Sequence, residues 1–170
     1  MFKKMLTTRS ICVAAVIAAL YAALTMALAP LSFAAIQCRV SEALTILPVL
    51  LPQAIPGLTV GCLLANLLGL SSGLTTVWDV VFGTLATLLA ALGTWAFRRR
   101  TVKIPGMDIP LLSALCPVLS NAVIVGLMLS LTLHLPLFLT MLEVGVGELI
   151  AVCIGVVLLP FLQRTRLPEL

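Results

Sequence analysis

The sequence predicts an all-α integral membrane protein, a bundle of six transmembrane helices with both termini in the cytoplasm. Of its 170 residues, 62% are hydrophobic and only 9% are charged, whereas a soluble domain of this size carries about 25% charged residues. The apolar residues form runs of helical length, and the basic residues gather between these runs. A water-soluble surface cannot be built from what remains, so we expect one multi-pass domain, residues 1–170, in the plasma membrane.

Six apolar segments are expected to be the helices. The first, residues 10–29, contains no charged residue and, at about 1.5 Å per residue, is just long enough to cross a hydrocarbon core of about 30 Å. We interpret it as a retained helix and not as a cleaved signal peptide, whose apolar core is shorter, about 7–15 residues. The second segment is short and broken by prolines. The other five segments are residues 42–51, 55–70, 78–97, 111–133 and 137–160.

The basic residues set the expected orientation. With six crossings and a cytoplasmic N-terminus, nine of the ten lysines and arginines lie on the cytoplasmic side, as the positive-inside rule requires. The tenth is Arg39, at the outer end of the second segment. The net charge of +4 therefore reflects topology, and we expect this chain to contact the lipid bilayer and no nucleic acid.

Charged and amide side chains inside or beside the apolar segments indicate a polar binding site. A charged side chain at mid-membrane costs about 2.5–3.5 kcal/mol even on a lenient scale, so such residues face a bundle interior or a cavity. In the expected topology they gather toward the outer face, where Trp78 is a candidate to stack on a ligand ring. They are Arg39, Glu42, Asn66, Asp79, Asn121, Glu143 and Glu148.

Simpler explanations remain for part of this set. Arg39 and Glu42, three residues apart, can pair with each other at the start of a helix. Trp78 stands at the end of its segment, where an interfacial aromatic belt explains it. Glu143 and Glu148 are separated by about 140° around a helix with 3.6 residues per turn, so they cannot both face one pocket equally well.

An excess of carboxylates over a single arginine predicts a ligand that is cationic or rich in N–H donors. A purine-like base with a guanine edge fits, because a carboxylate accepts from its N–H groups while an arginine or amide donates to its carbonyl oxygen. The sequence has no GxxxxGK[ST] phosphate loop and no metal-ligand spacing among its five cysteines and one histidine. We therefore expect no enzyme, no metal and no cofactor, with the driving force coming from a partner or an ion gradient.

Alanine recurs at every fourth position of the first segment, in two neighbouring lines. Small residues at this spacing let a second helix approach closely where lipid gives no hydrophobic driving force. That helix can belong to this bundle or to a partner. The lines are Ala14, Ala18, Ala22 and Ala15, Ala19, Ala23.

Five blocks, in the right order, resemble the QueT family of queuosine-precursor transporters. They are LSFAAIQCRVSEALTILP (31–48), AIPGLTVGCLLANLLG (54–69), WDVVFGTLATLLAA (78–91), PVLSNAVIVG (117–126) and VGVGELIAV (144–152). The resemblance implies a substrate-binding S component of an energy-coupling factor (ECF) transporter, with an aminomethyl-deazaguanine base, a cation with a guanine edge, as substrate. It also implies a transmembrane coupling subunit and two ATPase subunits as partners, so that ATP is used outside this chain. The alanine lines then resemble the AxxxA feature on which the coupling subunit docks.

The resemblance also implies which polar residues contact the substrate. Glu143 falls outside the family motif and ranks below Glu148. Two departures affect the expected ligand: Cys38 stands in place of a larger apolar residue, and Met128 stands where an acid often follows the Asn block. The matched polar positions are Gln37, Arg39, Glu42, Asn66, Asp79, Asn121 and Glu148.

Three alternative functions stay open at this point. The chain can be an autonomous proton- or ion-coupled carrier, with its intramembrane acids as relays. It can be an S component for another small vitamin-like or purine-like substrate. A membrane enzyme or assembly protein is disfavoured, because no catalytic constellation is found.

Overall fold

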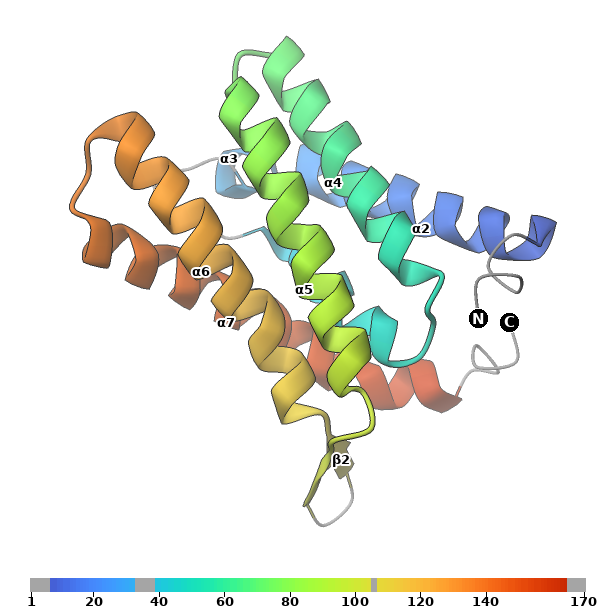
Figure 1. The fold of residues 1–170 in the computed structure, drawn as a ribbon. Helices are drawn as coiled ribbons and strands as arrows, with labels where there is room; N and C mark the ends of the chain where they lie inside the picture. The colour runs from blue at the N-terminus through green and yellow to red at the C-terminus, as the bar shows by residue number, and fades with distance from the viewer. Residues whose placement is uncertain (1–6, 33–38, 105–106, 165–170) are drawn as a thin grey trace.

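The computed structural model describes residues 7–32, 39–104 and 107–164, which form a helical bundle (Figure 1). Among these residues, five helices are long and apolar enough to span a membrane. They are α2 (Thr8–Ala27), α4 (Ala54–Ser71), the helix Asp79–Phe97, α6 (Leu111–Leu133) and α7 (Leu137–Arg164). The predicted helical membrane class is confirmed. The count of six spans and the cytoplasmic termini stay predictions.

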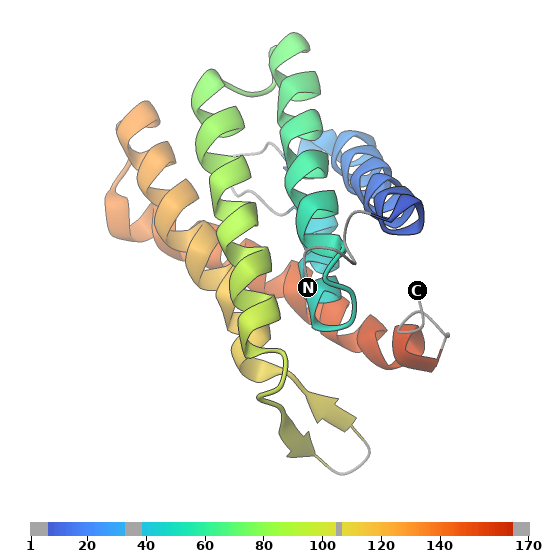
Figure 2. The ribbon, with the colours of Figure 1, turned by 45° about the vertical axis from the view of Figure 1, so that its right-hand side comes forward.

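The five long helices form two layers. α4, the helix Asp79–Phe97 and α6 lie side by side, and α2 and α7 cross behind them (Figures 1 and 2). α2 packs on α4, and α7 packs on α6. The start of α2 and the end of α7 lie on the same side of the molecule in both views.

The short second segment is the central element of the fold. Here the structure departs from the expected helix over residues 42–51, because η1 (Val40–Val49) is a ten-residue 3₁₀-helix with seven of its residues buried. It contacts all five long helices. At about 2.0 Å per residue it reaches about 20 Å, too short for the hydrocarbon core. η1 therefore lies among the other helices and carries its polar residues into the interior.

Glycines on α4 allow α2 to pack closely. A Cβ placed on Gly61 would lie 2.9 Å from the carbonyl oxygen of Ala18 and 2.8 Å from Cβ of Tyr21, so only glycine fits there. The alanine line Ala14, Ala18, Ala22 consequently faces α4, and Ala18 and Ala22 are buried. Packing within the chain thus occupies this line, which the sequence offered as a partner surface.

The second alanine line lies on the other side of α2. Ala15, Ala19 and Ala23 are all exposed. The structure therefore separates two lines that the sequence could not tell apart, and only the exposed line remains open to a partner helix.

Three further features complete the fold. The helix Asp79–Phe97 begins with a π-helical stretch, η2 (Asp79–Gly83), which continues as α5 (Thr84–Phe97). A short antiparallel hairpin, β1 (Val102–Ile104) with β2 (Met107–Ile109), lies between α5 and α6. A short helix, α3 (Ala29–Ser32), follows α2.

Candidate functional site

A small polar cavity lies where η1 meets α6 and α7. Arg39 and Glu42 come from the start of η1, Asn121 from α6 and Glu148 from α7, with Val125 and Val144 completing the wall. The space open to the centre of a water molecule is about 10 Å³, which is room for about one water. Four of the polar residues singled out from the sequence thus meet around one small cavity.

Three buried polar atoms of this cavity have no hydrogen-bond partner among the residues that the structure describes. They are Oε2 of Glu42, Nδ2 of Asn121 and Oε1 of Glu148. The three side chains are only 1%, 5% and 5% exposed. An unpaired buried polar group costs about 1–3 kcal/mol, and more when it is charged. Two acceptors and one donor around a single cavity are therefore available to a polar ligand.

Glu42 is held by the helices around it. Its Oε1 accepts hydrogen bonds from the Tyr21 hydroxyl on α2 and from Oγ1 of Thr87 on α5, the latter at 3.3 Å. Its place in the first turn of η1 also suits a carboxylate, because the N-terminus of a helix carries a partial positive charge. One carboxylate oxygen is thus anchored to the bundle while the other is left to the cavity.

Arg39 is buried at the position that precedes η1. Its Nη1 donates to Sγ of Cys62 at 3.9 Å, and a Cβ placed on Gly83 would lie 3.6 Å from the same nitrogen. Gly83 ends the π-helical stretch, and π-helical turns are frequent at functional sites. The guanidinium therefore reaches from the cavity toward α4 and η2, and the close neighbour of Gly83 is Nδ2 of Asn66, which would lie 3.0 Å from a Cβ at that position.

Asn66 and Asp79 lie outside this cavity and bond to other groups of the bundle, although Oδ1 of Asn66 is buried without a hydrogen-bond partner among the described residues. Nδ2 of Asn66 donates to Sγ of Cys62 at 3.4 Å and to the carbonyl oxygen of Asp79 at 3.1 Å. Oδ2 of Asp79 accepts from the backbone nitrogen and from Oγ1 of Thr76, both at 2.8 Å. Thr76 and Asp79 therefore form a capping box at the start of their helix, and Asn66 ties α4 to η2.

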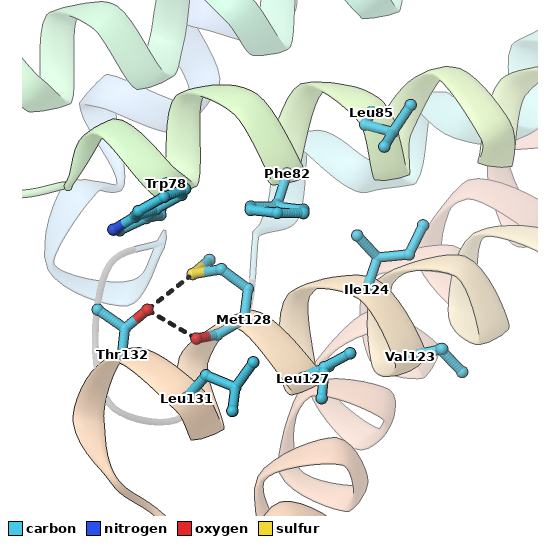
Figure 3. A pocket seen from close by; sticks show the side chains of 9 residues that line it. All are labelled: Trp78, Phe82, Leu85, Val123, Ile124, Leu127, Met128, Leu131 and Thr132. Carbon is cyan, nitrogen blue, oxygen red and sulfur yellow. Dashed lines mark hydrogen bonds between the residues drawn. The ribbon is translucent and has the colours of Figure 1, made fainter.

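A much larger hollow than this cavity is an apolar groove between the helix Asp79–Phe97 and α6 (Figure 3). It measures about 650 Å³, and Trp78 and Phe82 line one side of it. Its polar side chain, Thr132, donates to the carbonyl oxygen of Met128 in its own helix at 2.7 Å. A groove of this composition on a membrane protein suits hydrocarbon, so we place the candidate site for a polar ligand in the smaller cavity.

A comparison with known protein families identifies the family of this chain. A family model described as QueT transporter matches residues 11–164. This chain belongs to the QueT transporter family. No curated protein and no solved structure gives a significant match. The family and the apolar helices together indicate a multi-pass membrane transporter, which favours transport over catalysis.

The remaining candidates of this QueT family member lie away from the cavity or outside the described residues. Trp78 is 56% exposed and lines the apolar groove. Glu143 is half-buried on α7 and does not line the cavity. Met128, where an acid was expected, is buried beside the same groove. Gln37, like its neighbour Cys38, lies outside the described residues.

Three residues around the cavity were missed by the sequence reasoning. Tyr21 and Thr87 bind Glu42, and Cys62 accepts from Arg39, Asn66 and Thr87. The rule that intramembrane polar groups face the interior was applied to charges and amides but not to hydroxyls. Nothing in the sequence sets Cys62 apart from the other cysteines, and its position among donors is a property of the fold.

Proposed function

We propose that this QueT family member is the substrate-binding S component of an ECF-type importer. It captures a queuosine precursor, an aminomethyl-deazaguanine base, at the outer face of the plasma membrane. A transmembrane coupling subunit and two ATPase subunits then drive uptake with ATP. The chain itself performs no catalysis and needs no cofactor.

The observation that supports this proposal is the set of buried atoms on Glu42, Asn121 and Glu148 that surround one cavity and have no hydrogen-bond partner in the described part of the chain. Two carboxylates face one guanidinium there, so the ionised cavity has an excess negative charge. A cationic base supplies the missing positive charge. Its guanine edge donates to carboxylate oxygens, and its carbonyl oxygen accepts from an amide or a guanidinium.

The size of the cavity requires movement on binding. About 10 Å³ for the centre of a water holds about one water molecule, far less than a bicyclic base. Ligand entry must therefore separate η1 from α6 and α7, the three elements that form the walls. In this proposal the described state is a closed, ligand-free one.

The exposed line Ala15, Ala19, Ala23 is a surface of α2 on which a helix of a partner subunit can pack. Small side chains allow close helix approach in lipid, and this line is exposed on the surface of the chain. We propose it as the docking surface for the coupling subunit. The positive-inside pattern supports the accompanying orientation, with both termini cytoplasmic and the cavity nearer the outer face.

Equilibrium binding to the purified chain tests the proposed substrate. The panel is aminomethyl-deazaguanine, a deazaguanine with a neutral substituent at the same position, guanine, and adenine, which lacks the guanine edge. We expect the cationic base to bind most tightly and adenine most weakly. Equal binding of adenine, or no binding of any deazaguanine, would contradict the proposal.

The same buried carboxylates also suit a second function, an autonomous proton-coupled carrier, because intramembrane acids serve as proton relays. Uptake by cells that express the chain with and without the ATPase subunits separates the two. Uptake that continues without the ATPases, and that collapses when the proton gradient is removed, would establish the carrier instead.

A further inference from the structure

We propose that Tyr21 is a positioning residue that holds Glu42 so that its second carboxylate oxygen faces the substrate cavity. This inference rests on the proposed function, because the cavity is taken to hold a cationic base. Tyr21 lies on α2, outside the cavity wall, and acts through Glu42.

The contacts around Glu42 single out Tyr21 as its main donor. The Tyr21 hydroxyl and Oγ1 of Thr87 both bond to Oε1 of Glu42. However, Oγ1 of Thr87 lies 3.3 Å from Glu42 Oε1 and also 3.3 Å from Sγ of Cys62. A hydroxyl has one proton, so Thr87 divides it between two acceptors. The Tyr21 hydroxyl also lies near Sγ of Cys62, but its hydrogen bond of good geometry among the described residues goes to Oε1 of Glu42.

The surrounding packing fixes the Tyr21 ring. Tyr21 is 0% exposed, and its Cβ sits against Gly61 of α4, where no other residue would fit. One turn further along α2, Oγ1 of Thr25 donates to the Tyr21 carbonyl oxygen at 2.9 Å and contacts Oγ of Ser41 on η1 at 2.7 Å. α2 is thus tied to both α4 and η1 beside Tyr21, so the hydroxyl is held in a defined place.

A hydrogen bond to one oxygen of a carboxylate also fixes the direction in which its second oxygen points. With Oε1 bonded to Tyr21, Oε2 is the atom of Glu42 that has no partner among the described residues. Donation by the phenol also stabilises the ionised form of Glu42, which is the form that attracts a cation. Removing the hydroxyl should therefore weaken binding of a cationic base while Glu42 itself is still present.

A double-mutant cycle with aminomethyl-deazaguanine as probe tests this coupling on the purified full-length chain. We expect Tyr21→Phe to weaken binding about tenfold in the wild-type background and less than twofold in a Glu42→Gln background. Thr94→Val is the control, because it removes a buried hydroxyl that bonds to the carbonyl oxygen of Ser113 and contacts neither Tyr21 nor Glu42, and it should leave affinity within twofold. Equal losses in both backgrounds, or no loss in the wild type, would overturn the inference.

A spectroscopic measurement tests the same contact without ligand. Tyr21 is the single tyrosine of the chain, so labelling tyrosine with ¹³C at Cζ gives one NMR signal that reports on the state of its hydroxyl. Glu42→Gln should move this signal, and an unmoved signal would overturn the inference even if the substrate is correct. If the wild type binds no deazaguanine, the proposed substrate fails, while the NMR signal still decides whether Tyr21 holds Glu42.

Discussion

Replacing Glu148 by glutamine should weaken binding of the cationic base without destabilising the ligand-free protein. Glu148 is buried on α7, and its Oε1 has no hydrogen-bond partner among the described residues. The substitution keeps the shape and removes the charge. Because that oxygen makes no hydrogen bond of good geometry with the described residues in the ligand-free state, we expect the cost to appear when the ligand is bound.

The magnitude follows from the contact that is lost. A hydrogen bond to a charged group contributes about 1.5–3 kcal/mol, which corresponds to about a 10- to 150-fold rise in Kd. For the ligand-free protein, removing a buried carboxylate that lacks a partner relieves a desolvation cost. We therefore expect the midpoint of unfolding to stay the same or to rise.

The assay is equilibrium binding of aminomethyl-deazaguanine together with thermal unfolding of the ligand-free chain in the same detergent. Glu143→Gln is the comparison, because Glu143 lies on the same helix, is half-buried and does not line the cavity. It should leave Kd within twofold. An unchanged Kd for Glu148→Gln would refute the reasoning, and so would a fall in its unfolding midpoint that accounts for the weaker binding.

Three further outcomes are expected. Asp79→Ala should destabilise the fold by about 0.5–2 kcal/mol through loss of its cap and change ligand affinity less than threefold; a large affinity loss at an unchanged unfolding midpoint would instead assign this carboxylate to the ligand. Gly61→Ala should destabilise the fold by about 1–3 kcal/mol, because the added Cβ would lie 2.8 Å from Cβ of Tyr21. Thermal unfolding measures this loss of stability, and an unchanged midpoint would show that α2 and α4 can separate freely. Ala19→Leu should leave ligand binding intact and reduce uptake in cells that contain the ATPase partners. Ala18→Leu should instead lower the unfolding midpoint, because Ala18 is buried against α4. Full uptake with Ala19→Leu would exclude the exposed line as the docking surface.

The alanine lines show that residue spacing on a membrane helix does not predict which face of the helix is buried. Ala18 and Ala19 have the same type, spacing and apolar neighbours, so nothing in the sequence distinguishes their surroundings. The packing of Gly61 against Ala18 determines which of the two alanines is buried. A small residue permits any helix to approach closely, and the arrangement of the whole bundle determines which helix packs there.

The polar residues show the same limit at the candidate site. The cost of placing charge in lipid predicted that Glu42, Asp79 and Glu148 would avoid the lipid face, and all three are buried. Sequence spacing could not tell which of them already has a partner. Oδ2 of Asp79 bonds to Thr76, three residues away, whereas Glu42 and Glu148 meet across helices that are far apart in the chain.

The sequence by itself determined that this is a helical membrane protein and which side chains are too polar to face hydrocarbon, because the free energy of transfer into lipid is a sum over residues. The tertiary structure alone decided that η1 is a short 3₁₀-helix at the centre, that Tyr21 anchors Glu42, and that three buried atoms around one cavity lack hydrogen-bond partners within residues 7–32, 39–104 and 107–164. Hydrogen bonds are directional and reach about 3 Å, so their pairing depends on how the helices pack and not on the order of residues along the chain.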